Sequence, residues 1–526
     1  MSDTAVEPAN PETTSSGRRK EVMVVLPGLM LAILLAMLDN MIVGTAMPRI
    51  VGELGGLDHL SWVVTAYILG TTVSTPLWGK IGDLYGRKNI FIASIVIFLV
   101  GSALSGMSQS MGELIGFRAL QGLGAGGLLV GAMAIIGDLV PPRERGRYQG
   151  MMAGVMALAM IGGPLAGGFI TDNLNWRWAF YVNIPLGGAA LVWLLLRLNL
   201  PKYRTEHRID WLGAGLLSIG ITSLVLITTW GGGQYAWGSW QIIGLALLGV
   251  VTLIAFGFVE RRVAEPILSL DLFKNRNFAL VSGIGFLLGF AMFGAINFLP
   301  LYQQTVQGAS ATNSGLLLLP MMLTLMVVSV FAGQVITKTG RYKIFPIIGG
   351  IGMTVGMILL SFVDVGTTKL QLALFMSALG FGMGFLMQTT MLIAQNSVEQ
   401  KDLGVASSAA TFFRSIGGSF GVALFGTIFV RHLKDDIASR LGPAAAEQMT
   451  SGGGQVDPRL VQTLPAPLKE ALFHGIASSL STVFVWAIPF AAVVAVLAFF
   501  IREVKLRGAE DTPAAVQEQA LVDALD

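Results

Sequence analysis

Three charged residues lie inside long apolar segments of the sequence. Asp39 stands in the run LLAMLDNMIVGTAMP, and Arg118 and Arg414 stand in two later runs. A charge at the centre of a bilayer costs at least ~2.5–3.5 kcal/mol, so such residues usually face a cavity or a partner. A carboxylate and an arginine placed in this way can exchange protons or hold a charged ligand. The alternative is that the two arginines only support helix packing through backbone carbonyls.

The composition indicates that a membrane surrounds most of the chain. Apolar residues make up 53% of the 526 residues and charged residues 12%, whereas a soluble domain has roughly 25% charged residues. The 66 glycines are typical of helices that pack closely in lipid. The absence of cysteine excludes disulfides, thiolate metal sites and cysteine nucleophiles. We therefore expect an all-α integral membrane protein.

Fourteen segments are long and apolar enough to span a bilayer, which takes about 20 residues each. The polar segments 1–20 and 504–526 are predicted to be disordered cytoplasmic tails. The first apolar run is too long for a secretory signal and is expected to be a retained helix. The predicted spans are residues 22–44, 61–79, 90–107, 112–137, 148–170, 178–197, 211–230, 240–259, 278–304, 314–336, 345–362, 370–395, 402–430 and 479–501.

The positions of lysine and arginine predict the orientation, because basic residues favour cytoplasmic loops. With the N-terminus inside, 24 of the 34 basic residues fall on the cytoplasmic side and eight on the external side. Five of those eight lie in one long external segment, residues 431–478. We expect this segment to be a solvated linker, with a lid, a lipid-surface element or a partner site as alternatives. An even number of spans also places the C-terminus in the cytoplasm.

The pattern G-x3-[D/T]-x2-G-R occurs twice, at residues 79–87 and 333–341, each time after a predicted span. Parallel repeats of this kind allow one half of a transporter to rock against the other. The repeat predicts three parts, which are an N-terminal six-helix half (21–197), an inserted two-helix linker (198–277) and a C-terminal six-helix half (278–503).

The first copy of the repeat is predicted to form a conformational latch. Its glycines allow a close helix approach and a tight turn. Asp83 can accept hydrogen bonds from Arg87 or from a helix N-terminus. The second copy has Thr337 in place of the acid, so its latch must be weaker or absent. The alternative is a loop that serves only topology. The predicted latch comprises Gly79, Asp83, Gly86, Arg87 and Asp138.

These features resemble the major facilitator superfamily, and specifically its fourteen-helix drug:proton antiporter (multidrug efflux) family, over about residues 22–503. The resemblance implies alternating access between the two halves and a role for Arg118 in proton coupling. The segments that carry it are 39–48 (DNMIVGTAMP), 79–88, 118–126 (RALQGLGAG), 176–187 (WRWAFYVNIPLG) and 210–213 (DWLG).

A glycine-rich segment in the fifth predicted span is similar to the antiporter motif of that family, which marks exporters. Glycines let this helix press on a neighbour, and a proline bends it. We expect a tight seam against the opposite half. Ala159 stands where the family usually has a further glycine. The matching residues are Gly150, Gly163, Pro164, Gly167 and Gly168.

We predict that Asp39 takes up a proton from outside and releases it inside, and that Arg118 responds to its charge. Inward proton flow would then drive efflux of drugs or other amphipathic molecules with no cofactor. Methionine and aromatic side chains suit varied lipophilic substrates, although each can equally serve packing or face lipid. The candidate cavity residues are Met37, Met41, Phe290, Phe293, Asn297, Met387, Gln388, Phe412, Phe413 and Arg414.

The charge of the C-terminal half bears on the substrate. No acid lies in the interiors of its predicted spans between residues 278 and 430, which argues mildly against dications and leaves neutral or anionic compounds open. Two other functions also stay open. They are export of lipids or an endogenous metabolite with an external partner, and solute import on the same fold.

Enzyme chemistry is not expected, because no HExxH motif, phosphate-binding loop or Ser/His/Asp set is present. The sequence offers no metal site, and the lack of GxxxxGK[ST] argues against ATP drive. We expect a multi-pass monomer in the plasma membrane. Its partners would be the lipid bilayer, protons and small-molecule substrates, with no nucleic acid.

Overall fold

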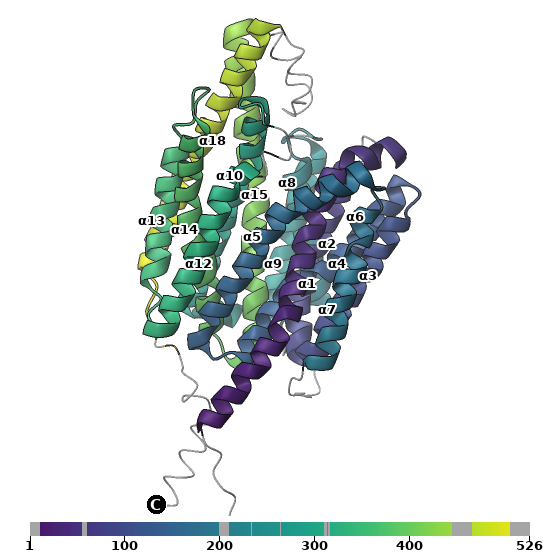
Figure 1. Ribbon diagram of the computed structural model, residues 1–526, viewed down its shortest axis with the longest axis vertical. Helices are drawn as coiled ribbons and strands as arrows, with labels where there is room; N and C mark the ends of the chain where they lie inside the picture. Colours follow the sequence, from purple (N-terminus) through teal and green to yellow (C-terminus); the bar gives the residue numbers. More distant parts are fainter. Residues whose placement is uncertain are drawn as a thin grey trace, which may run out of the picture.

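The computed structural model describes most of the chain, and the described residues form an almost wholly helical bundle (Figure 1). An isolated bridge between Gly231 and Tyr235 is the one β-type pairing among them. The described residues are 11–54, 60–198, 210–232, 234–263, 265–309, 313, 316–443, 446, 465–504 and 506.

The first part of the chain forms the group of helices on the right of Figure 1, in purple to blue, and an inserted pair follows it. The helices of this first half are α1 (Pro11–Leu54), α2 (Leu60–Tyr85), α3 (Arg87–Met107), α4 (Met111–Leu139), α5 (Pro142–Asn173), α6 (Trp178–Tyr181) and α7 (Asn183–Arg197). The inserted pair is α8 (Trp211–Trp230) and α9 (Trp240–Glu260).

The last part of the chain forms the group on the left, in green to yellow. A short 3-10 helix, η2 (Leu270–Lys274), leads into it, and a second, η3 (Gln400–Asp402), precedes its fifth helix. The helices of this second half are α10 (Arg276–Thr305), α12 (Leu319–Thr339), α13 (Ile344–Leu360), α14 (Lys369–Asn396), α15 (Leu403–Leu441) and α18 (Ala466–Phe499).

Ten helical segments of the described residues are long and apolar enough to cross a membrane, by length and composition. Two shorter apolar helical stretches, Arg276–Met292 and Ile344–Leu360, lie in α10 and α13. The helices α2 and α5 are outside this set of ten. The chain is therefore a multi-pass helical membrane protein, and the number fourteen stays a prediction.

Each half has its own apolar interior. One buried cluster joins residues of α10 to α18 and includes Leu217 and Phe256 of the inserted pair. Two further clusters, one around Leu29 and Phe98 and one around Ile42, consist of residues of the first half, apart from Met391 of α14 in the former. Burial of these side chains fixes the helices of each half relative to one another, because large apolar residues interlock in a close-packed interior.

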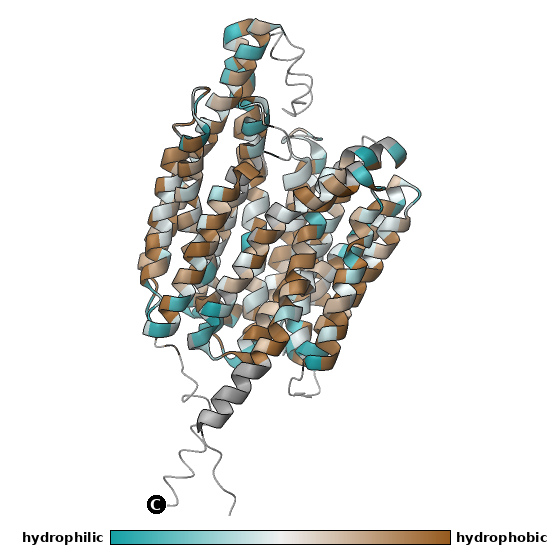
Figure 2. Cartoon of the chain, viewed as in Figure 1, coloured by the Kyte–Doolittle hydropathy of each residue, from teal (hydrophilic) through white to brown (hydrophobic). Residues whose placement is uncertain are grey.

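The outer surface of the bundle is apolar between two hydrophilic ends (Figure 2). Large side chains in the middle of helices, such as Leu247 of α9 (65% exposed) and Phe331 of α12 (55% exposed), point outward there. A soluble protein rarely exposes a contiguous apolar surface of this extent. This surface is what a lipid environment requires.

Two predicted segments differ from the structure. The helix α1 begins at Pro11, so residues 11–20, predicted as part of a disordered tail, are helical. Within the predicted external segment 431–478, α15 continues to Leu441 and α18 already begins at Ala466. Extending an existing helix adds one hydrogen bond per residue without a new nucleation cost, which explains both extensions. The other residues of the two tails and residues 447–464 lie outside the described part.

The extended ends of α15 and α18 pack on each other beyond the rest of the bundle, at the top of Figure 1. Leu433 and Ile437 on α15 and Ile476 on α18 are fully buried. His432 and Ser478 are joined by a side-chain hydrogen bond of 3.0 Å. These two ends of the segment therefore form a packed helical hairpin rather than a solvated linker.

Candidate functional site

The carboxylate of Asp39, in the middle of α1, is fully buried and surrounded by side-chain donors. Its Oδ2 accepts a hydrogen bond of 2.5 Å from Arg118 Nη1 on α4. Its Oδ1 accepts from Gln121 Nε2 at 2.8 Å and from Asn183 Nδ2, on α7, at 2.7 Å. Three donors from two other helices thus hold one carboxylate, and a buried charge requires such compensation.

The guanidinium of Arg118 lies between the carboxylate and two aromatic rings. Its Cζ is 4.1 Å from the ring centroid of Tyr67 on α2 and 5.8 Å from that of Phe180 on α6. Within the described residues, Nε and Nη2 have no hydrogen-bond partner. A desolvated cation over an aromatic face gains up to about 2 kcal/mol, so the two rings stabilise the side of Arg118 that Asp39 does not reach.

The local sequence explains how α4 presents this pair. Gln121 follows Arg118 by three residues and so lies on the same helix face, where its Oε1 accepts a 2.8 Å hydrogen bond from Arg118 Nη1. At Gly122, an added Cβ would lie 2.4 Å from the carbonyl oxygen of Tyr67. Only glycine allows this approach, which places the Tyr67 ring over the guanidinium.

A second row of bonds orients Asn183. Its Nδ2 also donates to Ser102 Oγ on α3 at 2.9 Å, and Ser102 Oγ in turn donates to the carbonyl of Phe180 at 2.9 Å. The hydroxyl of Tyr67 donates to the carbonyl of Ala36 on α1 at 3.1 Å. These bonds join α1, α2, α3, α6 and α7 around the carboxylate.

Asp39 and Arg118 are predicted from the sequence as a functional pair, but the side chains that complete the pair are not. Gln121 and Asn183 lie in the segments 118–126 and 176–187 that carry the resemblance to the antiporter family, but neither was predicted as a site residue. The position of Gln121, one turn from an arginine in a span, is a signal that could have identified it. For Asn183 and Tyr67 the local signal is weaker, because only the folded structure brings α7 and α2 to α1.

The predicted latch joins the two halves at the end of the bundle where α2 meets α3, here called the α2–α3 end. Asp83 accepts hydrogen bonds from the backbone N–H groups of Gly404 (3.1 Å) and Val405 (2.9 Å), in the first turn of α15. It also accepts from Nε (3.0 Å) and Nη2 (2.7 Å) of Arg87. The first amides of a helix have no partners within it, so Asp83 caps a helix of the opposite half.

Arg87 connects this cap to α4. Its Nη1 forms an ion pair of 2.6 Å with Asp138 and donates to the carbonyl of Ala134 at 2.9 Å. Its Nη2 reaches the carbonyl of Gln400 at 3.2 Å. Gly79 fits closely against α15, since an added Cβ would lie 2.5 Å from Ser408 Oγ. All five predicted latch residues are thus near one another, with Gly86 (φ 93°) making the turn.

The two repeat copies share the turn but not the cap. Both turn glycines have a positive φ, 93° at Gly86 and 70° at Gly340, which favours glycine at both positions, but their ψ angles of 126° and -1° differ. Thr337, at the position of Asp83, donates to the carbonyl of Gly333 within its own helix at 2.8 Å. A hydroxyl cannot reproduce the two charge-assisted contacts that the Asp83 carboxylate makes with α15.

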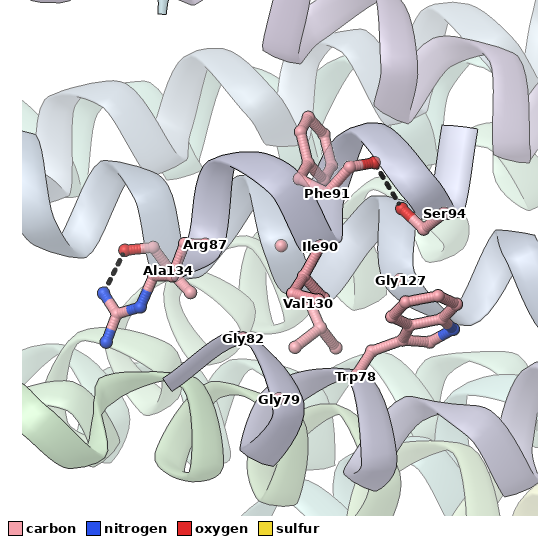
Figure 3. A pocket seen from close by; sticks show the side chains of 11 residues that line it. Trp78, Gly79, Gly82, Arg87, Ile90, Phe91, Ser94, Gly127, Val130 and Ala134 are labelled. Carbon is pink, nitrogen blue, oxygen red and sulfur yellow. Dashed lines mark hydrogen bonds between the residues drawn. The ribbon is translucent and has the colours of Figure 1, made fainter. Parts of the chain in front are cut away.

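A pocket beside the latch has a volume of about 10 Å³ and is lined by residues of α2, α3 and α4 (Figure 3). The view shows Arg87 directed to the carbonyl of Ala134 on one side and the ring of Trp78 on the other. This volume holds about one water molecule. It does not admit an organic substrate, so the pocket belongs to the packing of the latch.

The glycines of the helix 5 segment contact two different neighbours. An added Cβ at Gly150 would lie 3.0–3.3 Å from the backbone of Ser329 and Val330 on α12, in the opposite half. At Gly163 and Gly167 it would collide with Met41 and Thr45, on α1 of the same half. The expected seam against the opposite half is therefore wrong for this second pair.

The remaining residues of the helix 5 segment give no further evidence of a seam between the halves. Nothing lies within 4 Å of a Cβ at Gly168, and the side chain of Pro164 lies outside the described residues. Gly146, which was not predicted, makes a closer contact between the halves than Gly150, since a Cβ on Gly333 would lie 2.2 Å from its carbonyl oxygen. The seam lies toward the α2–α3 end, where the first turns of α5 meet the last turns of α12.

The predicted cavity residues fall into different environments. Phe290 is 6% exposed and packs against the rings of Phe425 and Phe490 inside the second half. Gln388 is also buried and donates to the carbonyl of Gly146, so it links the halves. Phe412 is 6% exposed and lies in the second half's apolar cluster. Those that are half-buried are Met37, Met41, Met387, Phe413 and Arg414, and the side chains of Phe293 and Asn297 lie outside the described residues.

The comparisons with known proteins agree with this helical architecture. Residues 29–422 match the family model described as Major Facilitator Superfamily. The chain is 37% identical over 524 residues to the "Multidrug transporter protein MdtP" of Bacillus subtilis, covering 95% of this chain and 96% of that protein. It is 32% identical over 522 residues to "Efflux pump FUS6" of Gibberella fujikuroi, covering 97% and 94%.

Among solved structures, the chain is similar in fold to the proton:xylose symporter XylE bound to 6-bromo-6-deoxy-D-glucose. The TM-score is 0.58 at 15% sequence identity, covering 94% of this chain and 98% of that one. At this identity the likeness concerns the fold alone. The family match covers most of the chain and the relatives align along nearly all of it. The chain therefore belongs to the major facilitator superfamily, and it is a multi-pass membrane transporter rather than an enzyme.

Proposed function

We propose that this transporter is a proton-coupled exporter of drugs or other amphipathic small molecules, of the fourteen-helix drug:proton antiporter type. The names of two relatives that align over nearly the whole chain, a multidrug transporter and an efflux pump, support export. The fully buried pair of Asp39 and Arg118 is the observation that carries proton coupling.

The pair suits a proton switch because its two charge states differ in every contact. Ionised Asp39 accepts hydrogen bonds from Arg118, Gln121 and Asn183. A protonated carboxyl would no longer balance the guanidinium, which then lacks a counter-ion in a buried site. Breaking a buried ion pair typically costs about 3–5 kcal/mol. Protonation of Asp39 would therefore destabilise this arrangement relative to one in which Arg118 meets water or another partner.

The pair is also connected to the latch through rigid elements. Tyr67, against which Arg118 lies, is on α2, the helix whose last turn carries Asp83. Arg118 itself is on α4, which carries Asp138 in the latch. A shift of Arg118 on protonation would act on α2 and α4 together and would weaken or strengthen the cap on α15.

The contacts between the halves support alternating access. The bonds of Asp83 to α15 and the glycine contacts of α5 with α12 all lie toward the α2–α3 end. The distribution of basic residues assigns this end to the cytoplasm, with both termini on the same side. On that assignment, the cap of Asp83 and the glycine contacts would close the transporter toward the cytoplasm. Transport would need only lipid, protons and substrate, and no cofactor, with a monomer as the working unit.

Reconstituted transport of a dye tests the proposal. The purified chain is placed in liposomes with an imposed pH gradient, and movement of an amphipathic fluorescent dye is followed for the wild type and for Asp39→Asn. Asparagine keeps the size of the side chain but cannot exchange a proton. We expect gradient-driven transport by the wild type to be lost in the variant, while dye exchange without a gradient persists.

Two results would contradict the proposal. If Asp39→Asn keeps the wild-type rate of gradient-driven transport, Asp39 is not the coupling residue. If the wild type moves dye in the same direction as the proton flow, the chain is an importer on the same fold. A collapse of the gradient with a protonophore serves as the internal control.

A further inference from the structure

Arg414 lies deep in the membrane portion of α15. It follows the first residue of this helix by eleven positions, which places it roughly 16 Å along the helix axis from the α2–α3 end. Its side chain is half-buried. An arginine keeps its charge in proteins, so this position holds a permanent cation.

The part of the chain that the structure describes places no counter-ion beside this cation. Among the described residues, Arg414 has no hydrogen bond and no ion pair. The helices α8, α10 and α14, which pack against α15, contain no acid, and Asp39 is already paired with Arg118. The acids of α2, α4, α15, α18 and η3 lie near the helix ends and are Asp83, Glu113, Asp138, Asp402, Asp435, Asp436 and Glu470.

The first turns of the helix face that carries Arg414 lie against the opposite half. Leu403 lies 3.3 Å from the Cβ position of Gly137 on α4. Ser407 accepts a bond from Gln395, which also donates to the carbonyl of Met133 on α4. Ala410 packs against both large apolar clusters, and its carbonyl oxygen lies 3.7 Å from the Cβ position of Gly285 on α10. Spacings of four, three and four residues keep positions 403, 407, 410 and 414 on one face.

The backbone that positions Arg414 is tightly held. An added Cβ at Gly289 of α10 would lie 1.9 Å from the carbonyl oxygen of Arg414, and one at Gly417 would lie 2.0 Å from that of Phe286. The neighbouring Phe413 packs edge-on against Phe273, with ring centroids 5.7 Å apart. The cation is therefore presented from a fixed helix, the kind of support that a recognition group needs.

We propose that Arg414 binds the carboxylate of amphipathic substrates and makes the transporter selective for organic anions. A cation in a span is costly unless it meets a partner, and no partner is supplied by the described residues. A guanidinium fits a carboxylate with two parallel hydrogen bonds. This inference rests on the proposed function and assigns its substrate class.

Binding of a matched pair of probes tests this assignment. Pyrenebutyric acid and its methyl ester share the same ring and differ in the negative charge. Their binding to the full chain in nanodiscs of neutral phosphatidylcholine is measured by energy transfer from protein tryptophan to pyrene. We expect the wild type to bind the acid at least about tenfold more tightly than the ester, because a charge-assisted contact is the stronger one.

The variants separate recognition from packing. Arg414→Gln should weaken binding of the acid to the level of the ester and leave the ester unchanged, while Arg414→Lys should keep part of the preference. Arg431→Gln, at an exposed position of the same helix, should behave as the wild type. If Arg414→Gln does not fold, a reduced preference in Arg414→Lys with unchanged ester binding supports the proposal.

Two results would overturn it. One is a wild type that binds acid and ester equally, and the other is an equal loss of both probes in the Arg414 variants. Because binding is measured without a pH gradient, failure of proton coupling in Asp39→Asn liposomes would leave this result intact. Conversely, loss of anion preference would leave proton-coupled export standing.

Discussion

The carboxylate of Asp83, at the end of α2, accepts a hydrogen bond of 2.9 Å from the backbone nitrogen of Val405, in the first turn of α15. The two residues belong to different halves of the bundle. A single side chain therefore supplies a cap that a helix of the other half lacks on its own. This relationship makes separation of the halves at the α2–α3 end a step that must break hydrogen bonds.

Replacing Asp83 by alanine should open this end. The change leaves the amides of Gly404 and Val405 without their acceptor and removes one of the two carboxylates that pair with Arg87. Each unsatisfied buried group costs about 1–3 kcal/mol, so the ratio of closed to open molecules should fall about tenfold or more. Spin labels attached at cysteines introduced for Asn89 and Lys338 would report a longer distance between the halves.

The chain is suited to this measurement because it contains no native cysteine. Asp271→Ala is the matched control, since Asp271 pairs with Lys274 in an exposed ion pair of 2.7 Å. Such pairs contribute little, and the label distance should stay that of the parent. A closed population that is unchanged in Asp83→Ala would show that the cap does not hold the halves together.

A methyl group at Gly333 should prevent the halves from meeting. Its Cβ would lie 2.2 Å from the carbonyl oxygen of Gly146, a backbone atom that cannot move aside locally. We expect Gly333→Ala to lose most transport of the dye and to shift the same spin-label distance outward. Gly168→Ala is the control, because nothing lies within 4 Å of a Cβ there, and it should transport at nearly the parental rate. Equal transport by both variants would contradict the observed contact.

The ring of Tyr67 should matter more than its hydroxyl. Tyr67→Phe keeps the aromatic face 4.1 Å from Arg118 and removes only the bond to the carbonyl of Ala36. Tyr67→Leu removes the face and should cost about 1–2 kcal/mol more. Melting temperatures in detergent and rates of gradient-driven dye transport should both decrease in the order wild type, Tyr67→Phe, Tyr67→Leu. A leucine variant as stable and active as the phenylalanine variant would exclude a role for the ring.

The contact of Glu53 with Arg177 should depend on pH. The hydrogen bond from Arg177, and after it the 2.8 Å bond from Trp176, lowers the pKa of Glu53 from its ordinary value of 4.5. Because this pKa is lowered, the contact stabilises the fold at pH values above the ordinary glutamate pKa of 4.5. That stabilisation is lost as the pH falls through the lowered pKa of Glu53. The effect should be small, since the carboxylate is half-exposed.

Melting curves between about pH 7 and pH 3 would check this expectation. The wild type should lose more thermal stability on acidification than Glu53→Gln, whose amide does not titrate. At neutral pH the variant should be slightly less stable. If both lose stability in parallel over the whole range, Glu53 does not contribute to the pH dependence.

Part of the site could be predicted from residues close in sequence. The turn glycines at 86 and 340 have positive φ in both repeat copies, as the pattern G-x3-[D/T]-x2-G-R suggests. A charged residue in an apolar run has few stable surroundings, so Asp39 and Arg118 could be named as a pair before their 2.5 Å contact was known. The positions of the buried charges follow from composition and spacing, whereas the choice of Arg118 as the partner of Asp39 follows from the resemblance to the antiporter family.

The sequence by itself determined that the chain is a helical membrane transporter, because apolar length and the placement of charge dictate which segments enter lipid. Only the tertiary structure decided which side chains surround Asp39, which face of α5 meets α12 or α1, and that Asp83 caps α15. Hydropathy sets the length of a helix but not its rotation about its own axis. That rotation is fixed by packing with partners far away in sequence, as Gly122 against Tyr67 and Asn183 beside Asp39 illustrate.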